Sequence, residues 1–365
     1  MRVGLDGRDL LRKRTGVVNY TVELARRLTR RADGELVVYA DEFADADVLP
    51  PTDVALRRVA GAPIAWKHAA LPLALWRDRV DVFHSPTGTL PLVAPCRQVV
   101  TVHDLFAEIE PGWFPGPVGA RLRASQRRAA RAAAAVIAVS ETTRRDILNR
   151  YELQTERVRV VHNGVDHARF HPRPVHADTV VARYGVPCPF ILFVGSLLPW
   201  RNVPRLLRAV ARLNDGRGAP GCGLLVVGRD IWGTDPSARL AAERGWTSWA
   251  RFAGYVADDE LAELYAAAAV FAYPSLYDGF GIPPLEAMAC GTPVVASTAG
   301  ALPEVLGDAA LLVDPTDEQE LAEALRAAME QPEPLRNKGL AQASHYSWDR
   351  AAEETWHVYR QVHGG

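Results

Sequence analysis

The chain has 365 residues, of which 48% are apolar and 23% charged, and its formal net charge is −1. This length favours two domains, each with a core of its own, and the balanced charge excludes a global surface for nucleic acid. Four scattered cysteines without a CxxC pair indicate buried thiols in a reducing compartment. The N-terminus lacks the apolar core of a signal peptide, and no apolar run reaches the ~18 residues of a membrane span. We therefore expect a cytoplasmic protein.

Short apolar runs alternate with helical patterns along the chain. In the first half the runs predict strands at 2–6, 35–40, 54–59, 81–84, 98–102, 135–139 and 158–161. In the second half they predict strands at 190–194, 224–227, 251–253, 270–273, 294–296 and 311–313. Helical patterns lie between most of them, for example at 17–30, 203–213, 258–267 and 318–329. Such alternation is typical of parallel, doubly wound sheets, so we expect an α/β protein with two Rossmann-like domains.

A proline-bearing stretch without a clear apolar period separates the two sets of elements. It covers residues 167–187, and a strand pattern resumes only at Phe190. We therefore predict a first domain over 1–171 and a second over 172–345. The last segment, 346–365, is amphipathic and predicts a helix. On pattern alone it is equally well a helix of the second domain or one that returns to the first.

The first strand is followed by a loop and a helix start. The basic run 12–14 leads to Thr15 and Gly16, a pair that commonly opens a helix. Asn19 and Tyr20 lie in the first turn of that helix. Taken alone, these residues carry only a weak signal for ligand binding.

Two histidines stand at strand ends in the first half. His103, followed by Asp104, comes directly after the run 98–102, and His84 ends the run before it. Ligands bind at the carboxyl ends of strands in open α/β sheets, and histidine titrates near neutrality. On this pattern alone, a lone histidine at a strand end is usually structural.

A basic helix is predicted over Arg121–Arg131, with Arg123, Arg127 and Arg128 on it. A basic amphipathic helix can lie on anionic lipid at the inner face of a membrane. It can equally be a solvated face, because alanine rather than large apolar residues fills its other side. We favour the solvated face and keep the peripheral membrane contact as the alternative.

The strand 190–194 ends in Gly195 and Ser196, and Arg201 and Asn202 precede the next helix. Such a strand–glycine–loop–helix turn presents backbone N–H groups to an anion. The guanidinium of an arginine fits phosphate oxygens, which makes Arg201 a candidate phosphate ligand. The commoner fate of one arginine at a helix start is solvation.

The most specific motif lies within residues 270–292, which predict a buried strand, a glycine-bearing loop and a helix opened by prolines. Asp278 lies on the loop and Glu286 on the helix, with Gly279 and Gly281 between them. A carboxylate accepts two hydrogen bonds side by side, which matches a vicinal diol such as a ribose. Backbone N–H groups beside a helix N-terminus suit an anion. The alternative is a helix start that carries acids because its dipole favours them.

The run Asp278-Gly279-Phe280-Gly281-Ile282-Pro283-Pro284-Leu285-Glu286 resembles the donor-binding signature of the retaining glycosyltransferases of family 4. In that family the pattern is Glu, Gly, Phe, Gly, four residues and Glu. The spacing is kept here, but the first acid is one methylene shorter. The resemblance extends from Gly4 to the terminal helix, with the other motifs in the family's order.

The resemblance implies a GT-B fold, in which two Rossmann-like domains face a cleft and the terminal helix crosses back to the first domain. It implies a catalytic set of His103, Asp278 and Arg201. Asp278 would contact the donor sugar and Glu286 the ribose, while Arg201 would hold the diphosphate. Further implied donor-binding positions are Gly16, Ser196, Asn202, Tyr255, Val256, Gly279, Phe280, Gly281 and Ile282. The implied acceptor-binding positions are Asn19, Tyr20, His84 and Asp104.

The activity implied by the resemblance is the transfer of a hexosyl group, with retention, from a GDP- or UDP-sugar. Asp104-Leu105 match the sequence that commonly follows the histidine in one branch of the family, and the chain as a whole resembles the mannosyltransferase-like branch. The acceptor would be a hydroxyl of a glycan, a lipid-linked glycan or a small natural product. No cluster has metal-ligand spacing, so we expect no metal and no other cofactor. The alternatives are a sugar-nucleotide epimerase on the same fold and a non-catalytic sugar-nucleotide-binding subunit.

Overall fold

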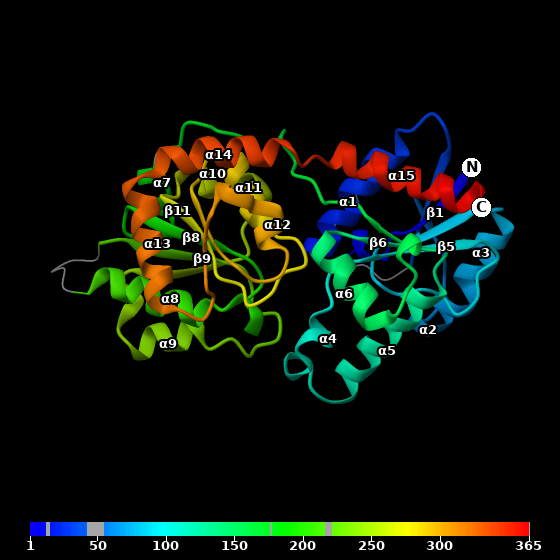
Figure 1. Cartoon of the computed structure of the whole chain (residues 1–365), viewed down its shortest axis with the longest axis horizontal. Helices are drawn as coiled ribbons and strands as arrows, with labels where there is room; N and C mark the ends of the chain where they lie inside the picture. Colours follow the sequence, from blue (N-terminus) through cyan, green and yellow to red (C-terminus); the bar gives the residue numbers. More distant parts are fainter. Residues whose placement is uncertain (12–14, 42–54, 176, 216–220, 365) are drawn as a thin grey trace. The chain divides into compact units, whose positions relative to one another are not determined.

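The computed structural model describes residues 1–11, 15–41, 55–175, 177–215 and 221–364 (Figure 1). The chain divides into two compact units: unit 1 is Met1–Gly164 with Trp348–Gly365, and unit 2 is Val165–Ser347. The division thus falls ahead of the boundary expected after residue 171. The basic run 12–14 and the first residue of the strand expected at 54–59 lie outside the described residues.

Within the described residues, unit 1 holds a seven-stranded sheet in the order β3-β2-β1-β4-β5-β6-β7, and each neighbouring pair is parallel. Its strands are β1 (Arg2–Asp6), β2 (Glu35–Ala40), β3 (Leu56–Arg58), β4 (Val82–Ser85), β5 (Arg97–Val102), β6 (Ala135–Ala138) and β7 (Val158–Val160). Its α-helices are α1 (Gly16–Thr29), α2 (Pro63–Ala65), α3 (Leu71–Arg77), α4 (Phe106–Ile109), α5 (Gly116–Ala132), α6 (Glu141–Tyr151) and α15 (Trp348–Gly364). Shorter or irregular helices are η1 (Arg8–Leu11), η2 (Trp66–Ala70), η3 (Pro111–Trp113) and η4 (Thr155–Arg157).

Unit 2 holds a six-stranded sheet in its described part, in the order β10-β9-β8-β11-β12-β13, again with parallel neighbours. Its strands are β8 (Phe190–Val194), β9 (Gly223–Val227), β10 (Ala250–Gly254), β11 (Val270–Tyr273), β12 (Val294–Ser297) and β13 (Leu311–Val313). Its α-helices are α7 (Ala177–Tyr184), α8 (Val203–Asn214), α9 (Ser237–Glu243), α10 (Asp258–Ala267), α11 (Ile282–Ala289), α12 (Leu302–Leu306), α13 (Glu318–Glu330) and α14 (Pro332–Ser344). The 3-10 turns are η5 (Pro199–Arg201), η6 (Trp246–Ser248) and η7 (Gly307–Ala309).

The two sheets confirm the expected α/β class with two Rossmann-like domains. Every residue of β8 and of β11 is buried, because a parallel sheet with helices on both faces hides both sides of its central strands. That is why these strands read as continuous apolar runs in the sequence rather than as alternating ones.

Each sheet has one point at which the strand order reverses, and this point positions the loops that matter. In unit 1 it lies between β1 and β4, and in unit 2 between β8 and β11. Ligands bind beyond the carboxyl ends of the strands at such a switch point. In unit 2 the two loops concerned are 195–202 and 274–281, which hold Arg201 and Asp278.

The terminal helix α15 packs in unit 1 against α1 and the strands β4, β5 and β6 (Figure 1). The ring of Trp348 lies 5.9 Å from that of Tyr20 in an edge-on arrangement. Arg27 of α1 forms an ion pair of 3.0 Å with Asp349, and the Trp356 indole donates to Asp33 over 2.9 Å. Aromatic burial therefore ties the end of the chain to its beginning.

Candidate active site

Arg201 and Asp278 meet in unit 2, at the ends of β8 and β11. The Arg201 guanidinium donates to the Asp278 carboxylate and to the Tyr273 hydroxyl, and also to Ser275 Oγ at 3.2 Å. The Tyr273 hydroxyl in turn donates to Asp278 Oδ2 over 2.8 Å. Side-chain exposure is 18% for Arg201 and 12% for Asp278. This largely buried cluster joins two residues to which the resemblance assigns the diphosphate and the donor sugar.

Tyr273 was not expected in the site. Its ring lies under the Arg201 guanidinium, 5.1 Å from ring centroid to guanidinium carbon. Burial is the main cause that raises the pKa of Tyr273 well above 10, with the Asp278 carboxylate adding to the rise. The phenol therefore keeps its proton near neutrality and acts as a donor. The one sequence feature that could have indicated a role for Tyr273 is its position as the last residue of the predicted strand 270–273.

The backbone around Asp278 is fixed by close approach of a neighbouring loop. The Ala301 N–H donates to the Asp278 carbonyl over 2.8 Å, and the Phe280 N–H donates to Asp278 Oδ1 over 3.2 Å. Gly300 has a φ of +61°, and a Cβ there would lie 2.3 Å from the Asp278 carbonyl oxygen. Glycine is needed at position 300 because any side chain would push the carboxylate away from Arg201.

Asn202, which the resemblance places among the donor-binding residues, also braces the loops of the site. The residue is only 8% exposed and adopts a left-handed conformation with φ of 61°. Its amide nitrogen donates to the carbonyls of Pro274 and Pro315 over 3.0 and 2.8 Å. Both amide hydrogens are thus committed to holding the loop after β11 against the loop after β13.

Glu286 is buried on α11 and is held by a tyrosine from another helix. It is 8% exposed, and the Tyr265 hydroxyl of α10 donates to its Oε2 over 3.0 Å. Burial, followed by the Glu286 charge, raises the pKa of Tyr265 well above 10. Tyr265 therefore stays protonated and orients the carboxylate. Tyr265 lies in another helix, 21 residues away, and nothing in the sequence connected the two.

The start of α11 offers fewer donors than a typical helix. The helix begins at Ile282, earlier than the residue expected, so Pro283 and Pro284 lie within its first turn and carry no N–H. In the described chain, neither the Gly281 nor the Ile282 N–H donates to another protein group. Gly281 has a φ of +97°, a conformation that favours glycine. Two backbone donors remain for an anion.

The other expected donor-binding residues lie at neighbouring strand ends. Ser196, directly after β8, is half-buried, and Gly279 and Phe280 are buried in the loop before α11. Tyr255, after β10, is 50% exposed, with the Arg229 guanidinium carbon 4.9 Å from its ring centroid. Val256 beside it is 6% exposed, so only its backbone could meet a ligand.

In unit 1, His103 lies at the end of β5 in a desolvated position. Its Nε2 lies 2.9 Å from the Pro86 carbonyl, which can only accept, so Nε2 carries the proton. The Tyr20 ring contacts the imidazole edge-on with centroids 4.8 Å apart. Burial lowers the pKa of His103 to about 4. At neutral pH the ring is uncharged and presents Nδ1 as an acceptor.

His84 and Tyr20, two of the expected acceptor-binding residues, are buried within unit 1. Their exposures are 0% and 1%. His84 Nε2 and the Tyr20 hydroxyl both bond Thr101 Oγ1, at 2.8 and 3.0 Å, and His84 Nδ1 bonds the Tyr359 hydroxyl at 2.6 Å. Burial lowers the pKa of His84 to about 3. This polar chain joins α15 to β4, β5 and α1, and its member Tyr20 also contacts the His103 ring.

Gly16, Asn19 and Asp104 keep accessible surface. Gly16 is exposed at the start of α1, and a Cβ built on it would meet no atom within 4 Å. Thr15 caps that helix by accepting from the Val18 N–H over 3.3 Å. Asn19 and Asp104 are half-buried. Packing within unit 1 therefore does not require glycine at position 16, which leaves room there for a ligand.

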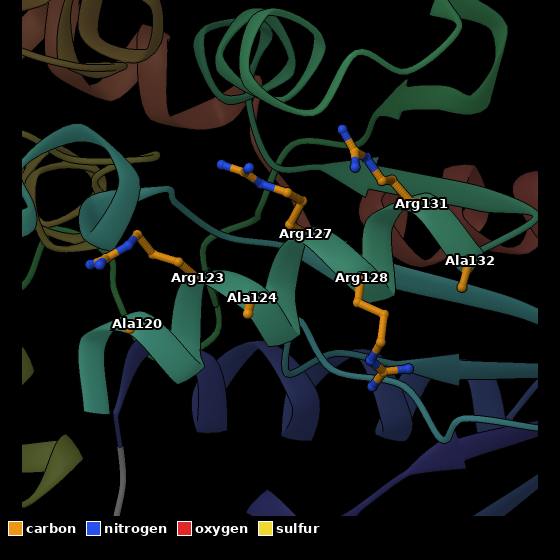
Figure 2. A pocket seen from close by; sticks show the side chains of 7 residues that line it. All are labelled: Ala120, Arg123, Ala124, Arg127, Arg128, Arg131 and Ala132. Atoms are coloured by element: carbon orange, nitrogen blue, oxygen red, sulfur yellow. The ribbon is translucent and has the colours of Figure 1, made fainter. Parts of the chain in front are cut away.

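Four arginines of α5 donate hydrogen bonds to other elements of unit 1. A hollow of about 760 Å³ runs along the helix and is lined by residues of this helix alone; in Figure 2, Arg127 and Arg131 point to one side of it and Arg128 to the other. Arg123 donates to the Ala107 carbonyl, Arg127 to both Glu108 oxygens, Arg128 to the Leu90 carbonyl and Arg131 to the Tyr151 carbonyl.

Two absences hold for the described ranges of the chain. No helix there combines the length and the apolar character that crossing a membrane requires. No group of three or more His, Cys, Asp or Glu side chains in those ranges is placed to hold a metal ion.

Fold and site together define a glycosyltransferase of the GT-B type. The chain belongs to the family 4, or group 1, glycosyltransferases. The family sequence model described as "Glycosyltransferase Family 4" matches residues 14–169 of the chain. The family sequence model described as "Glycosyl transferases group 1" matches residues 186–343. The two matches fall on the two sheet-bearing parts of the chain.

Curated relatives share about a third of their residues with this chain. The O-antigen chain mannosyltransferase B of Escherichia coli is 32% identical over 292 residues, covering 78% of this chain and 75% of that protein. The MMP alpha-(1->4)-mannosyltransferase of Mycolicibacterium hassiacum is 34% identical over 316 residues, covering 80% and 74%.

Solved structures show the same fold over the full length. Sucrose-phosphate synthase from Thermosynechococcus elongatus superimposes with a TM-score of 0.80 at 21% identity, covering 99% of each chain. HepE of Anabaena, solved in complex with UDP-glucose, gives a TM-score of 0.78 at 20% identity and also covers 99% of each chain.

Proposed function

We propose that this glycosyltransferase is a metal-independent, retaining hexosyltransferase that uses a GDP- or UDP-sugar. Unit 2 binds the donor, and unit 1 binds the acceptor hydroxyl of a glycan, a lipid-linked glycan or a small natural product. The observation that carries the proposal is the Arg201–Asp278 pair at the switch point of unit 2, one loop away from Glu286. The mannosyltransferase name of the Escherichia coli relative and the UDP-glucose bound to HepE support a hexosyl nucleotide as donor.

Donor binding is divided among three groups of unit 2. The Glu286 carboxylate, oriented by Tyr265, accepts from the ribose hydroxyls. Arg201 donates to the diphosphate, and the open N–H groups of Gly281 and Ile282 add two neutral donors. Asp278 accepts from hydroxyls of the sugar.

The reaction forms a bond from the acceptor oxygen to the anomeric carbon and breaks the bond from that carbon to the diphosphate. The acceptor attacks on the face from which the diphosphate leaves, and its proton passes to a diphosphate oxygen. Negative charge therefore grows on the leaving group, where Arg201 stabilises it without a metal. His103, uncharged and fixed through Pro86, accepts a hydrogen bond from a sugar hydroxyl at Nδ1 and so positions it.

A thermal-shift panel of nucleoside diphosphates tests the donor assignment. Wild-type protein is titrated with UDP, GDP, ADP and CDP, and with the matching hexosyl nucleotides. UDP or GDP should raise the melting temperature with saturation, because a ligand that binds only the folded state stabilises it by mass action. Absence of a saturable shift with all four diphosphates would remove the proposal.

Turnover assays separate the transferase from the two alternatives. A transferase releases nucleoside diphosphate only when an acceptor hydroxyl is supplied. An epimerase would convert the donor sugar without acceptor, and a binding subunit would bind the donor and release nothing.

A further inference from the structure

The chain passes between its two units twice, and the two passages are paired with each other. Unit 2 begins at Val165 and ends at Ser347, and these two residues form an isolated parallel bridge. The Val165 N–H also donates to the Tyr346 carbonyl over 3.3 Å. We call 165–170 and 346–347 the crossing segments. Backbone pairing joins the two crossing segments within unit 2.

The second crossing segment packs on the loop that holds Asp278. The Tyr346 ring meets the Phe280 ring edge-on, with centroids 5.7 Å apart and ring planes at 81°. Phe280 is 3% exposed, and its backbone N–H donates to Asp278 Oδ1 over 3.2 Å. An edge-to-face contact sets the relative orientation of two rings. Tyr346 therefore holds in place the backbone that orients the Asp278 carboxylate.

The first crossing segment packs on the tyrosine that orients Glu286. The Phe170 ring, 4% exposed, meets the Tyr265 ring edge-on, with centroids 5.7 Å apart. The Tyr265 ring also contacts the ring of Phe271 in β11, at 5.4 Å, and its hydroxyl donates to Glu286 Oε2 over 3.0 Å. Because protein interiors are close-packed, the two phenylalanines leave the Tyr265 ring little room to move. Its hydroxyl therefore stays directed at the Glu286 carboxylate.

We propose that Phe170 and Tyr346 are positioning residues of the donor site. Phe170 positions Glu286 for the ribose of the donor. Tyr346 positions Asp278 for the donor sugar. The inference rests on the proposed function insofar as these two acids bind the donor. Because each positioning residue belongs to a crossing segment, donor binding and the pairing of the crossing segments favour each other by the same free energy.

Phe170→Leu tests the first role with a pair of ligands in calorimetric titration. Leucine keeps an apolar side chain but removes the ring that holds Tyr265. UDP or GDP, whichever saturates the wild type, should therefore bind about three- to tenfold more weakly. The 2′,3′-dideoxy form of the same diphosphate should lose less than about twofold, because it has no diol for Glu286 to hold. Equal losses for the two ligands, or no loss for either, would overturn the role of Phe170.

The matched control is Phe190→Leu, the same substitution elsewhere in the core of unit 2. Phe190 is fully buried at the start of β8, whereas the loop that holds Arg201 follows the end of that strand. The control should lower the melting temperature, because it leaves a cavity, and should change neither affinity by more than about twofold. A control that weakens the diol ligand as Phe170→Leu does would show that any loosened core has this effect, and would overturn the positioning role.

Tyr346→Leu and Tyr346→Phe test the second role by comparing a diphosphate with its hexosyl nucleotide, UDP-glucose or GDP-mannose. Asp278 meets the sugar, so Tyr346→Leu should weaken the hexosyl nucleotide about three- to tenfold and leave the diphosphate within about twofold. Tyr346→Phe keeps the ring against Phe280 and should bind both ligands as the wild type does. Equal losses with leucine and phenylalanine, or unchanged affinity with leucine, would overturn the role of Tyr346.

Hydrogen exchange in the wild type tests the coupling without any variant that could unfold. The Val165 amide donates to the Tyr346 carbonyl, so its exchange rate reports the pairing of the crossing segments. Saturating UDP or GDP should slow this exchange at least about threefold, and the dideoxy form at equal occupancy should leave it unchanged. Exchange that the diol ligand does not slow, or that both ligands slow equally, would overturn the coupling. Absence of saturable binding of any diphosphate to the wild type would instead remove the proposed function.

Discussion

Arg201 and Asp278 form an ion pair inside unit 2, and the Tyr273 hydroxyl bonds both partners. The guanidinium that would stabilise the leaving diphosphate is therefore already paired with the carboxylate that would hold the sugar. Binding the donor must redistribute these hydrogen bonds, so the pair sets the charge of the empty site.

Asp278→Asn should separate donor binding from turnover. The neutral amide of the variant removes the ion pair with Arg201, which leaves the guanidinium freer to bind phosphate. The affinity for UDP or GDP should therefore stay within threefold of wild type or rise. Turnover should fall by about 10²- to 10³-fold, as for other lost contacts to a reacting group. Calorimetric titration and diphosphate release measure the two effects. A large loss of diphosphate affinity would show that Asp278 supports binding rather than reaction.

Tyr273→Phe should destabilise unit 2 by ~1–3 kcal/mol, because it removes a buried donor from Asp278 and an acceptor from Arg201. Urea unfolding gives the difference. The matched control is Tyr255→Phe, which removes a hydroxyl from a half-exposed ring and should change stability by less than ~0.5 kcal/mol. Equal effects of the two substitutions would argue against the buried hydroxyl as the cause.

Glu286→Ala should weaken nucleoside diphosphate binding by ~1–3 kcal/mol through loss of the ribose contacts. The sharp control is the ligand: a 2′,3′-dideoxyribose diphosphate should bind wild type and variant with equal affinity, because it has no diol to lose. If Glu286→Ala instead loses the same affinity for both diphosphates, the Glu286 carboxylate does not contact the ribose hydroxyls.

Acid should destabilise the protein through His84 and His103, because desolvation lowers the pKa of both side chains. Burial lowers the pKa of His103 to about 4 and that of His84 to about 3, while both groups titrate near 6.5 in an unfolded chain. Between pH 6.5 and 4 the unfolded state binds protons that the folded state does not, so the free energy of unfolding falls as pH falls through this window.

His84→Gln should flatten that pH dependence by about one proton equivalent, measured by urea unfolding at pH 4.5 and 6.5. His363→Gln at the exposed end of α15 is the control and should leave the slope unchanged. An unchanged slope in His84→Gln would contradict a neutral, buried His84.

Turnover should survive EDTA, because Arg201 and the N–H groups of Gly281 and Ile282 take the place of a cation at the diphosphate. Added magnesium should change the rate less than twofold after EDTA treatment and dialysis. If EDTA abolishes turnover and magnesium restores it, a metal ion rather than Arg201 neutralises the diphosphate, and the metal-independent mechanism is wrong.

The local pattern of the chain was enough to place the secondary structure and the specific motif. Strand predictions such as 190–194 and 270–273 coincide with β8 and β11, because a strand buried on both faces must be apolar at every position. The spacing of Asp278 and Glu286 could also be read from the sequence, because one loop and one helix turn separate the two acids along the chain.

Tertiary structure alone decided which side chains act together. Arg201 and Asp278 lie 77 residues apart in the sequence. The Asn202 side-chain amide donates to the carbonyl of Pro315, 113 residues away. His84 lies at a strand end as His103 does, yet Tyr359 of the terminal helix buries it. Arg123, Arg128 and Arg131 of α5 donate to backbone carbonyls of other segments, which the sequence of α5 does not show. The local sequence shows the hydrophobic periodicity of each segment. The burial and the hydrogen-bond partners of its side chains depend on which other segment packs against it.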